Sequence, residues 1–109
     1  MDKEWYTAII ITRSASTASD YRPLYQESMV LLQAASQEEA DEGAKWWADN
    51  NTPSYANSLG EQIEWKLVRV LEVKKTDDPP GHFVEIHTRF FRDYEAYRRF
   101  EPLLDGEIE

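Results

Sequence analysis

One stretch of this chain, residues 36–50, combines a helix-start signal with a repeating pattern of small apolar residues. The motif at 36–39, Ser-Gln-Glu-Glu, fits the capping box, in which the Ser hydroxyl accepts from the third helical amide and the last Glu reaches back to the Ser amide. Residues 50–53, Asn-Asn-Thr-Pro, end the predicted helix. Its apolar face is narrow enough to lie close to a sheet and consists of Ala40, Ala44, Trp47 and Ala48. Trp46 either edges the core or is exposed.

Three other segments are typical of β-strands. Trp5–Thr12 is rich in β-branched and aromatic residues and is apolar on both faces, which predicts a strand covered on both sides. Tyr25–Ala35 predicts a second strand, with a short helix at its start as the alternative. Apolar residues in Gln62–Lys74 change face along the run, which indicates a β-bulge or burial on both faces. Arg13–Asp20 is rich in Ser, Ala and Thr and predicts a flexible loop.

The last predicted strand, His82–Arg92, carries the main candidate site. Residues 76–81, Thr-Asp-Asp-Pro-Pro-Gly, predict a turn that joins it antiparallel to the preceding strand. Alternation along the strand would place Glu85, His87 and Arg89 in a row on one face, roughly 6.6–7 Å apart. An acid, an imidazole and a guanidinium would then be presented together on a rigid element.

These elements predict one α+β domain over residues 1–109, as the length of 109 residues also indicates. We expect an antiparallel four- to five-stranded sheet packed on one main helix. Asp93 is placed to cap a short C-terminal helix that Pro102 ends. The acidic tail, residues 105–109, is expected to fray.

Composition narrows the function classes. The chain has no cysteine, so disulfides, thiolate nucleophiles and cysteine-containing zinc sites are excluded, in agreement with a reducing compartment. The N-terminus lacks a leader pattern, and no run approaches the ~20 apolar residues of a membrane span, so we expect a cytoplasmic protein with no membrane association. A net charge of −9 argues against nucleic acid as a partner and favours a basic protein partner, unless the charge serves solubility alone.

No pattern predicts a metal or another cofactor. His82 and His87 are the only histidines and would point to opposite faces of a strand. The four glycines are too scattered for a phosphate loop, and no Ser and His stand at a nucleophilic spacing. The Glu85, His87 and Arg89 row could act as acid, base and anion holder, bind a ligand or partner, or form a solvated surface.

Four short motifs stand along the chain: Tyr25-x-Glu27-Ser28, Ala35-x-x-x-Glu39-Ala40, Tyr55-x-Asn57-x-x-Gly60-Glu61-x-x-x-Trp65 and Arg89-Phe90-Phe91. Together they resemble the bacterial family called domain of unknown function 4288. The similarity covers roughly Trp5 to Phe91. It implies a small α+β protein and brings no activity, cofactor or catalytic residue. The loop at 13–20 and the Arg-rich extension after Asp93 depart from the family pattern.

The sequence favours a small acidic interaction protein of the immunity or regulatory kind, without catalytic activity and able to form a homodimer. Aromatic and Arg side chains together are enriched at interface centres, which makes the C-terminal helix a candidate docking element. The alternative is a small-molecule-binding protein or enzyme that acts on an anionic substrate through Glu85, His87 and Arg89. The candidate ligand- or partner-binding residues are Glu85, His87, Arg89, Trp65, Tyr94, Tyr97 and Arg98.

Overall fold

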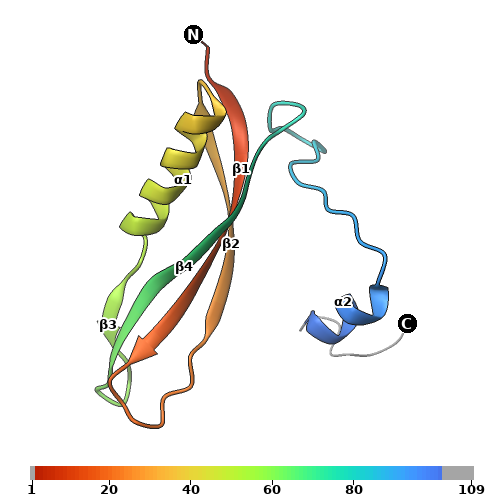
Figure 1. The fold of residues 1–109 in the computed structure, drawn as a ribbon. Helices are drawn as coiled ribbons and strands as arrows, with labels where there is room; N and C mark the ends of the chain where they lie inside the picture. The colour runs from red at the N-terminus through yellow and green to blue at the C-terminus, as the bar shows by residue number, and fades with distance from the viewer. Residues whose placement is uncertain (1, 102–109) are drawn as a thin grey trace.

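The computed structural model describes residues 2–101, which form one antiparallel sheet and two helices (Figure 1). The four strands of this region lie in the order β2-β1-β4-β3, each antiparallel to its neighbours. The predicted α+β class, antiparallel sheet, main helix and short C-terminal helix are confirmed. The elements follow the chain as β1 (Glu4–Ser16), β2 (Tyr25–Ala34), α1 (Gln37–Asn50), β3 (Ser54–Ala56), β4 (Gln62–Lys75) and α2 (Tyr94–Phe100).

β1 pairs with a strand on either side and is the most buried segment of the fold. Its residues 6–10, Tyr-Thr-Ala-Ile-Ile, are all buried. Ala8 and Ile10 join the core under α1, so alternation turns Thr7 and Ile9 toward the opposite side of the sheet. The predicted strand covered on both sides is therefore confirmed, and it runs from Glu4 to Ser16, beyond the predicted end at Thr12.

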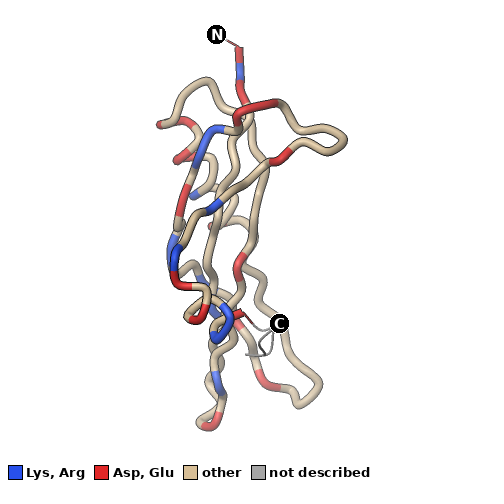
Figure 2. The backbone as a smooth tube through the Cα atoms, turned by 90° about the vertical axis from the view of Figure 1, so that its right-hand side faces the viewer, with Lys and Arg blue, Asp and Glu red and all other residues tan. Residues whose placement is uncertain are grey.

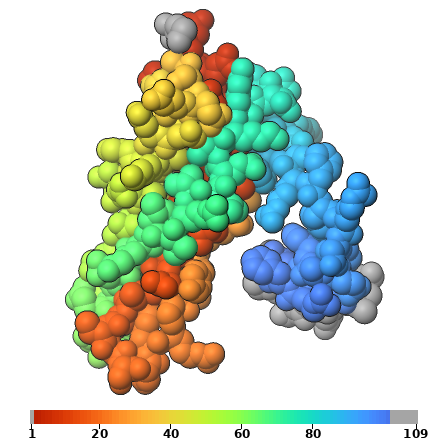
Figure 3. Space-filling model, in the orientation of Figure 1, coloured from red at the N-terminus to blue at the C-terminus, as the bar shows by residue number. Residues whose placement is uncertain are grey.

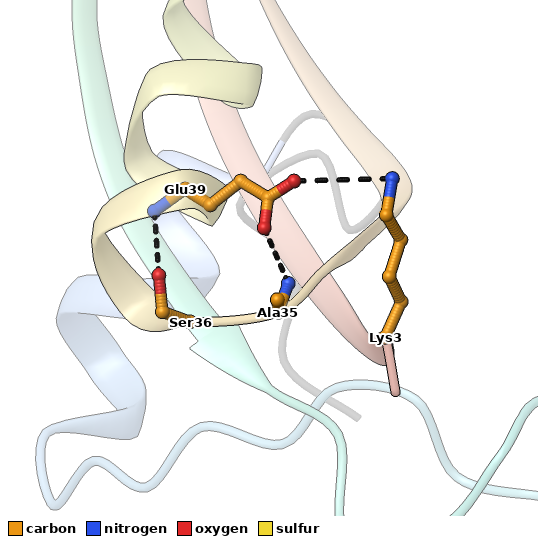
Figure 4. Close-up of polar contacts among 4 residues, drawn as sticks. All are labelled: Lys3, Ala35, Ser36 and Glu39. Carbon is orange, nitrogen blue, oxygen red and sulfur yellow. Dashed lines mark hydrogen bonds and ion pairs between the residues drawn. The ribbon is translucent and has the colours of Figure 1, made fainter. Parts of the chain in front are cut away.

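α1 begins with the predicted cap, and its Glu39 ties together three chain segments (Figure 4). The Ser36 hydroxyl accepts from the Glu39 amide at 3.1 Å. The Glu39 carboxylate accepts from the amide of Ala35 at 2.6 Å, one residue before the Ser36 amide that the capping box predicts. Its other oxygen lies 3.8 Å from the Lys3 ammonium. The start of α1 is thus fixed to the end of β2 and to the segment before β1.

α1 lies close to the sheet because its inner face consists of small side chains. Ala40, Ala44 and Ala48 are fully buried, and Trp47 packs partly buried beside them. Trp46 is 65% exposed, which settles its position on the outside of the helix. The helix therefore covers one face of the sheet and leaves the other face to a different part of the chain (Figure 1).

Two β-bulges in the pairing of β4 with β1 account for the change of face among the apolar residues of β4. The register skips one residue between Ile9 and Ile10, and again between Ile11 and Thr12, leaving Leu71 and Val68 without a partner on β1. Each extra residue shifts the alternation by one position. As a result, the partly buried apolar residues that β4 contributes to the core under α1 are Leu67, Val70 and Val73. The β-bulge alternative is therefore confirmed.

The segment predicted as a loop from Arg13 to Asp20 is a strand in its first half. β1 continues through Ser16, and the connection to β2 is correspondingly shorter. Ser14 is buried and organises this connection, because its hydroxyl accepts from the Leu24 amide at 2.9 Å and from the Tyr21 hydroxyl. β2 then starts at Tyr25 as a strand, which excludes the helical alternative there.

The predicted strand His82–Arg92 is wrong, because this segment forms no strand in the structure. Two features oppose a fifth strand beside β4. The Gln37 side chain at the start of α1 donates to the Val73 carbonyl at 3.0 Å on β4, and Phe83 has a left-handed backbone with φ 60°. Thr76 donates back to the Trp5 carbonyl of β1, after which the chain leaves the sheet. Apolar and polar residues do alternate along 82–92, but the segment pairs with no strand of the sheet.

The C-terminal region gives the molecule an open shape. The Cα radius of gyration is 17.1 Å, against about 13 Å for a compact chain of this length. α2 begins at the predicted cap, where the Asp93 carboxylate accepts from the Ala96 amide at 3.0 Å. It contacts neither α1 nor any strand, and it stands apart from the sheet (Figure 1). The predicted frayed tail, residues 105–109, lies outside the described residues.

Replacing Ser36 with Ala tests the cap that fixes α1. We expect the free energy of unfolding to fall by about 1 kcal/mol, because the Glu39 amide loses its acceptor. Ser36→Asp should retain most of the stability, since a carboxylate also accepts at this position. Denaturant unfolding gives the values, with the exposed Ser58→Ala as the matched control. Equal stabilities for Ser36→Ala and Ser58→Ala would contradict the role of the cap.

Candidate functional site

The sheet side opposite α1 carries the first candidate surface, which we call the outer face. Cross-strand pairing defines it, because directly paired residues share a side of the sheet. The buried Ile9 pairs with Met29 of β2 on one side and with Glu72 of β4 on the other. A central apolar strip is thus bordered by charged side chains of β4. The outer face comprises Thr7, Ile9, Ile11, Arg13, Tyr25, Glu27, Met29, Leu31, Arg69, Glu72 and Lys74.

The segment after the 76–81 turn lies against one end of this outer face. Ile86 and His87 line a small apolar hollow of about 30 Å³ together with Thr7, Ile9 and Met29. His87 Nδ1 is buried and has no hydrogen-bond partner within residues 2–101. The segment therefore supplies part of the cover that β1 needs on this side, by side-chain packing in place of strand pairing.

A larger hollow of about 260 Å³ opens beside His87 and mixes both signs of charge. Lys74 and Lys75 line it from β4, facing the carboxylates of Asp77 and Glu85. The Glu4 carboxylate pairs with the Lys75 ammonium and raises the pKa of Lys75 above its usual 10.5. No ion pair within residues 2–101 involves Lys74, which leaves its ammonium available to a bound anion.

The predicted Glu85, His87 and Arg89 row is divided between two places. Glu85 and His87 line the 260 Å³ hollow, whereas Arg89 lines a separate hollow of about 570 Å³ beside α2. The row was a consequence of the strand that the structure lacks. Trp65 belongs to neither hollow, and its indole Nε1 donates to the Tyr55 hydroxyl on β3 at 3.3 Å.

The second candidate surface is the segment Arg89–Phe100, which we call the arm. Its aromatic rings pack on one another: Phe91 stacks on Tyr97 with ring centroids 4.7 Å apart, and Tyr94 lies 6.4 Å from Tyr97. Phe100 is 78% exposed. The 570 Å³ hollow is lined by three rings and two arginines of the arm, together with Asp93 and Ala96: Arg89, Phe91, Arg92, Asp93, Ala96, Tyr97 and Phe100.

Arg98 occupies a different environment from the exposed rings. Its side chain is buried, and one guanidinium nitrogen donates to Glu95 at 2.9 Å. The other two, Nε and Nη1, have no hydrogen-bond partner among the described residues. The structure therefore brings the predicted residues Tyr94, Tyr97 and Arg98 together on α2, with the tyrosines exposed and the arginine covered.

Sequence reasoning missed the partners that come from distant strands. Thr7 and Lys74 face His87 only because β1 and β4 are neighbours and the chain folds back over them. The Lys-Lys-Thr-Asp-Asp run at 74–78 is the local signal that could have pointed to a charged hollow. Among residues 2–101, no three His, Asp or Glu side chains are grouped to hold a metal ion, and neither helix is long and apolar enough to cross a membrane.

The described region is thus a small α+β protein with a half-covered sheet and a projecting aromatic arm. The chain belongs to the family described as domain of unknown function (DUF4288), which matches residues 5–88. The match spans the whole sheet, α1 and the segment that carries Glu85 and His87, and it ends just before the arm. No curated protein and no solved structure matches the chain.

Amide hydrogen exchange tests the replacement of the predicted strand by a packed, unpaired segment. The amides of residues 85–92 have no partner in a sheet, so we expect them to exchange at rates close to those of a free chain. Amides of β1 that pair on both sides should exchange at least about 1,000-fold more slowly. NMR-detected exchange measures both sets in one sample. Slow exchange at alternate amides of residues 85–92 would contradict this expectation and indicate that the segment is a paired strand.

Proposed function

We propose that the protein is a small acidic interaction protein without catalytic activity, of the immunity or regulatory kind. The observation that carries this proposal is the arm, which presents exposed aromatic rings and contacts no other helix or strand of the described chain. Aromatic and Arg side chains dominate the binding energy at protein interfaces. Exposed rings on a projecting element favour a partner that covers them.

Charge supports a basic protein segment as the partner. Residues 1–88 carry fifteen acidic and eight basic side chains, so the body of the protein is strongly acidic. Acidic surfaces attract basic partners and speed their association. Basic positions are interspersed with acidic ones along the backbone (Figure 2), which disfavours nucleic acid because phosphate binding needs a concentrated basic surface.

A non-catalytic role agrees with how the candidate acid–base residues are arranged. Arg89 lines a different hollow from Glu85 and His87, so the three groups do not converge on one substrate position. We place the protein in the cytoplasm, since a chain without cysteine draws no stability from an oxidising compartment.

Truncating an aromatic ring of the arm tests this function. We expect Tyr97→Ala to abolish capture of protein partners from a lysate of the cells that make the protein, because the ring stacks with Phe91 in the arm. Quantitative mass spectrometry compares captured proteins between variants. His87→Ala and Phe83→Ala are the controls; Phe83 is fully exposed outside the arm, and both should retain capture. Capture that survives Tyr97→Ala, or is lost equally in Phe83→Ala, contradicts the proposal.

The 260 Å³ hollow supports a second candidate, a small-molecule site for an anionic group. Lys74 lines it together with His87, and the unpaired Lys74 ammonium could bind a phosphate or carboxylate. Asp77 and Glu85 at the same hollow would favour a ligand that also carries a positive group.

A titration distinguishes this candidate from the interaction protein. If the hollow binds anions, inorganic phosphate or glutamate should shift the amide NMR signals of residues around His87. Lys74→Ala should weaken that binding at least about tenfold, because a charge-assisted hydrogen bond is lost. Lys45→Ala is the matched control, since Lys45 is an exposed lysine of α1 on the other side of the sheet. Unchanged signals with both probes would remove the small-molecule candidate.

A further inference from the structure

Within residues 2–101, α2 packs on no strand and not on α1, and the outer face is covered at one end only; both stand on the same side of the sheet. In the space-filling view, open space separates the arm from the part of the sheet near the start of β2 (Figure 3). On that part of the outer face, Tyr25 is 59% and Met29 58% exposed, although Met29 pairs with the buried Ile9 of β1. In the described part of the chain, two partly apolar surfaces are therefore exposed and do not cover each other.

We propose that two copies of this chain exchange arms, so that the arm of each copy packs on the outer face of the other. This inference rests on the proposed function and names the partner as a second copy. Exchange of an identical element between protomers is a low-cost route to a dimer when the connecting segment holds that element away from its own body. Residues 85–88 are seated on the outer face, and the chain then leads α2 away from it.

The helical form of α2 is the first argument for an occupant. A helix of seven residues is marginal in water on its own, because nucleation costs more than so few hydrogen bonds return. The Asp93 cap and the Glu95–Arg98 pair together add only about 1–2 kcal/mol. Most helical stability in proteins comes from packing an apolar face. The described chain gives α2 no strand or helix to pack against.

Interface size is the second argument. Apart from the exposed Phe90, which lines the 260 Å³ hollow, four arm rings are exposed to different degrees: Phe91, Tyr94, Tyr97 and Phe100. Together they leave roughly 400 Å² of uncovered aromatic surface, at about 200 Å² for each whole ring. Two arms and the two faces they would cover then bury about 1,600 Å², the size of a standard stable interface. A reciprocal dimer reaches that size, whereas one arm on one face reaches only half of it.

Charge is the third argument, because the arm and the body have opposite signs. The arm carries four arginines and two acidic residues, whereas residues 1–88 are acidic. The outer face itself carries Arg13, Arg69 and Lys74 beside Glu27 and Glu72, so the local charge pairing is confined to its acids. Glu27 stands beside the exposed Tyr25 and Met29, where an arginine of an incoming arm can reach it. The arm is thus itself a basic, aromatic segment of the kind that the acidic body favours.

A complementation experiment tests the exchange. Analytical ultracentrifugation of the full chain across a concentration series should show a monomer–dimer equilibrium. Phe100→Asp in the arm and Met29→Asp on the outer face should each give monomers at concentrations where the unaltered chain is dimeric. An equimolar mixture of the two variants should form dimers at lower concentration than either variant alone, although at higher concentration than the unaltered chain, because one of its two arm–face contacts is intact. Phe83→Asp, an exposed ring outside the arm, should leave the dimer unchanged.

The single variants and their mixture together distinguish the exchange of arms from other arrangements of two copies. A dimer that Phe100→Asp dissociates but Met29→Asp leaves intact would show that arms pair with each other, and would overturn the inference. Tyr25→Asp replaces Met29→Asp if the latter unfolds, which circular dichroism reveals. A chain that is monomeric at every concentration also overturns the exchange, while arm-dependent capture of another protein would keep the proposed function. Failure of Tyr97→Ala and Phe100→Asp to change either capture or mass overturns both.

Discussion

Burial of β1 on both faces is the constraint from which the rest of the structure follows. Tyr6 to Ile10 are buried without interruption, so both sides of the central strand are shielded from water. One side is covered by a helix that approaches closely because its inner residues are alanines. The other side receives only Ile86, His87 and their neighbours. Hydrophobic burial of a central strand thus sets the position of α1 and leaves the outer face half covered.

Local signals in the sequence were sufficient for the first half of the fold. The capping motif located the start of α1 because it depends on hydrogen bonds within four residues, and the structure alters only the amide that Glu39 reaches. The mixed apolar pattern of β1 predicted a strand covered on both faces. The changes of phase in β4 predicted an irregularity, which the two bulges at Val68 and Leu71 supply. Each of these features is decided by neighbours along the chain.

The strand predicted at His82–Arg92 does not form, and the alternation of apolar and polar residues does not reveal the reason. Alternation says which side chains share a face if a strand forms, but a strand also needs an open edge to bond with. Gln37 donates to β4 on the edge where this strand would have paired, and Phe83 turns the backbone away. The candidate site therefore differs from the predicted row of Glu85, His87 and Arg89. Tyr94 and Tyr97 meet as predicted because a helix sets their spacing, whereas Lys74 meets His87 only through tertiary packing.

The separation of body and arm has a thermodynamic consequence for any partner of this protein. An arm that is ordered mainly by what it packs against must offset its own conformational entropy when it binds, which lowers the affinity gained per unit of buried area. Aromatic rings reduce that cost because each carries a large surface on few rotatable bonds. The stacking of Phe91 on Tyr97 and the Asp93 cap reduce it further by arranging the arm in advance. The composition of the arm is therefore suited to reversible association, in which charge sets the rate of encounter and aromatic burial sets the lifetime of the complex.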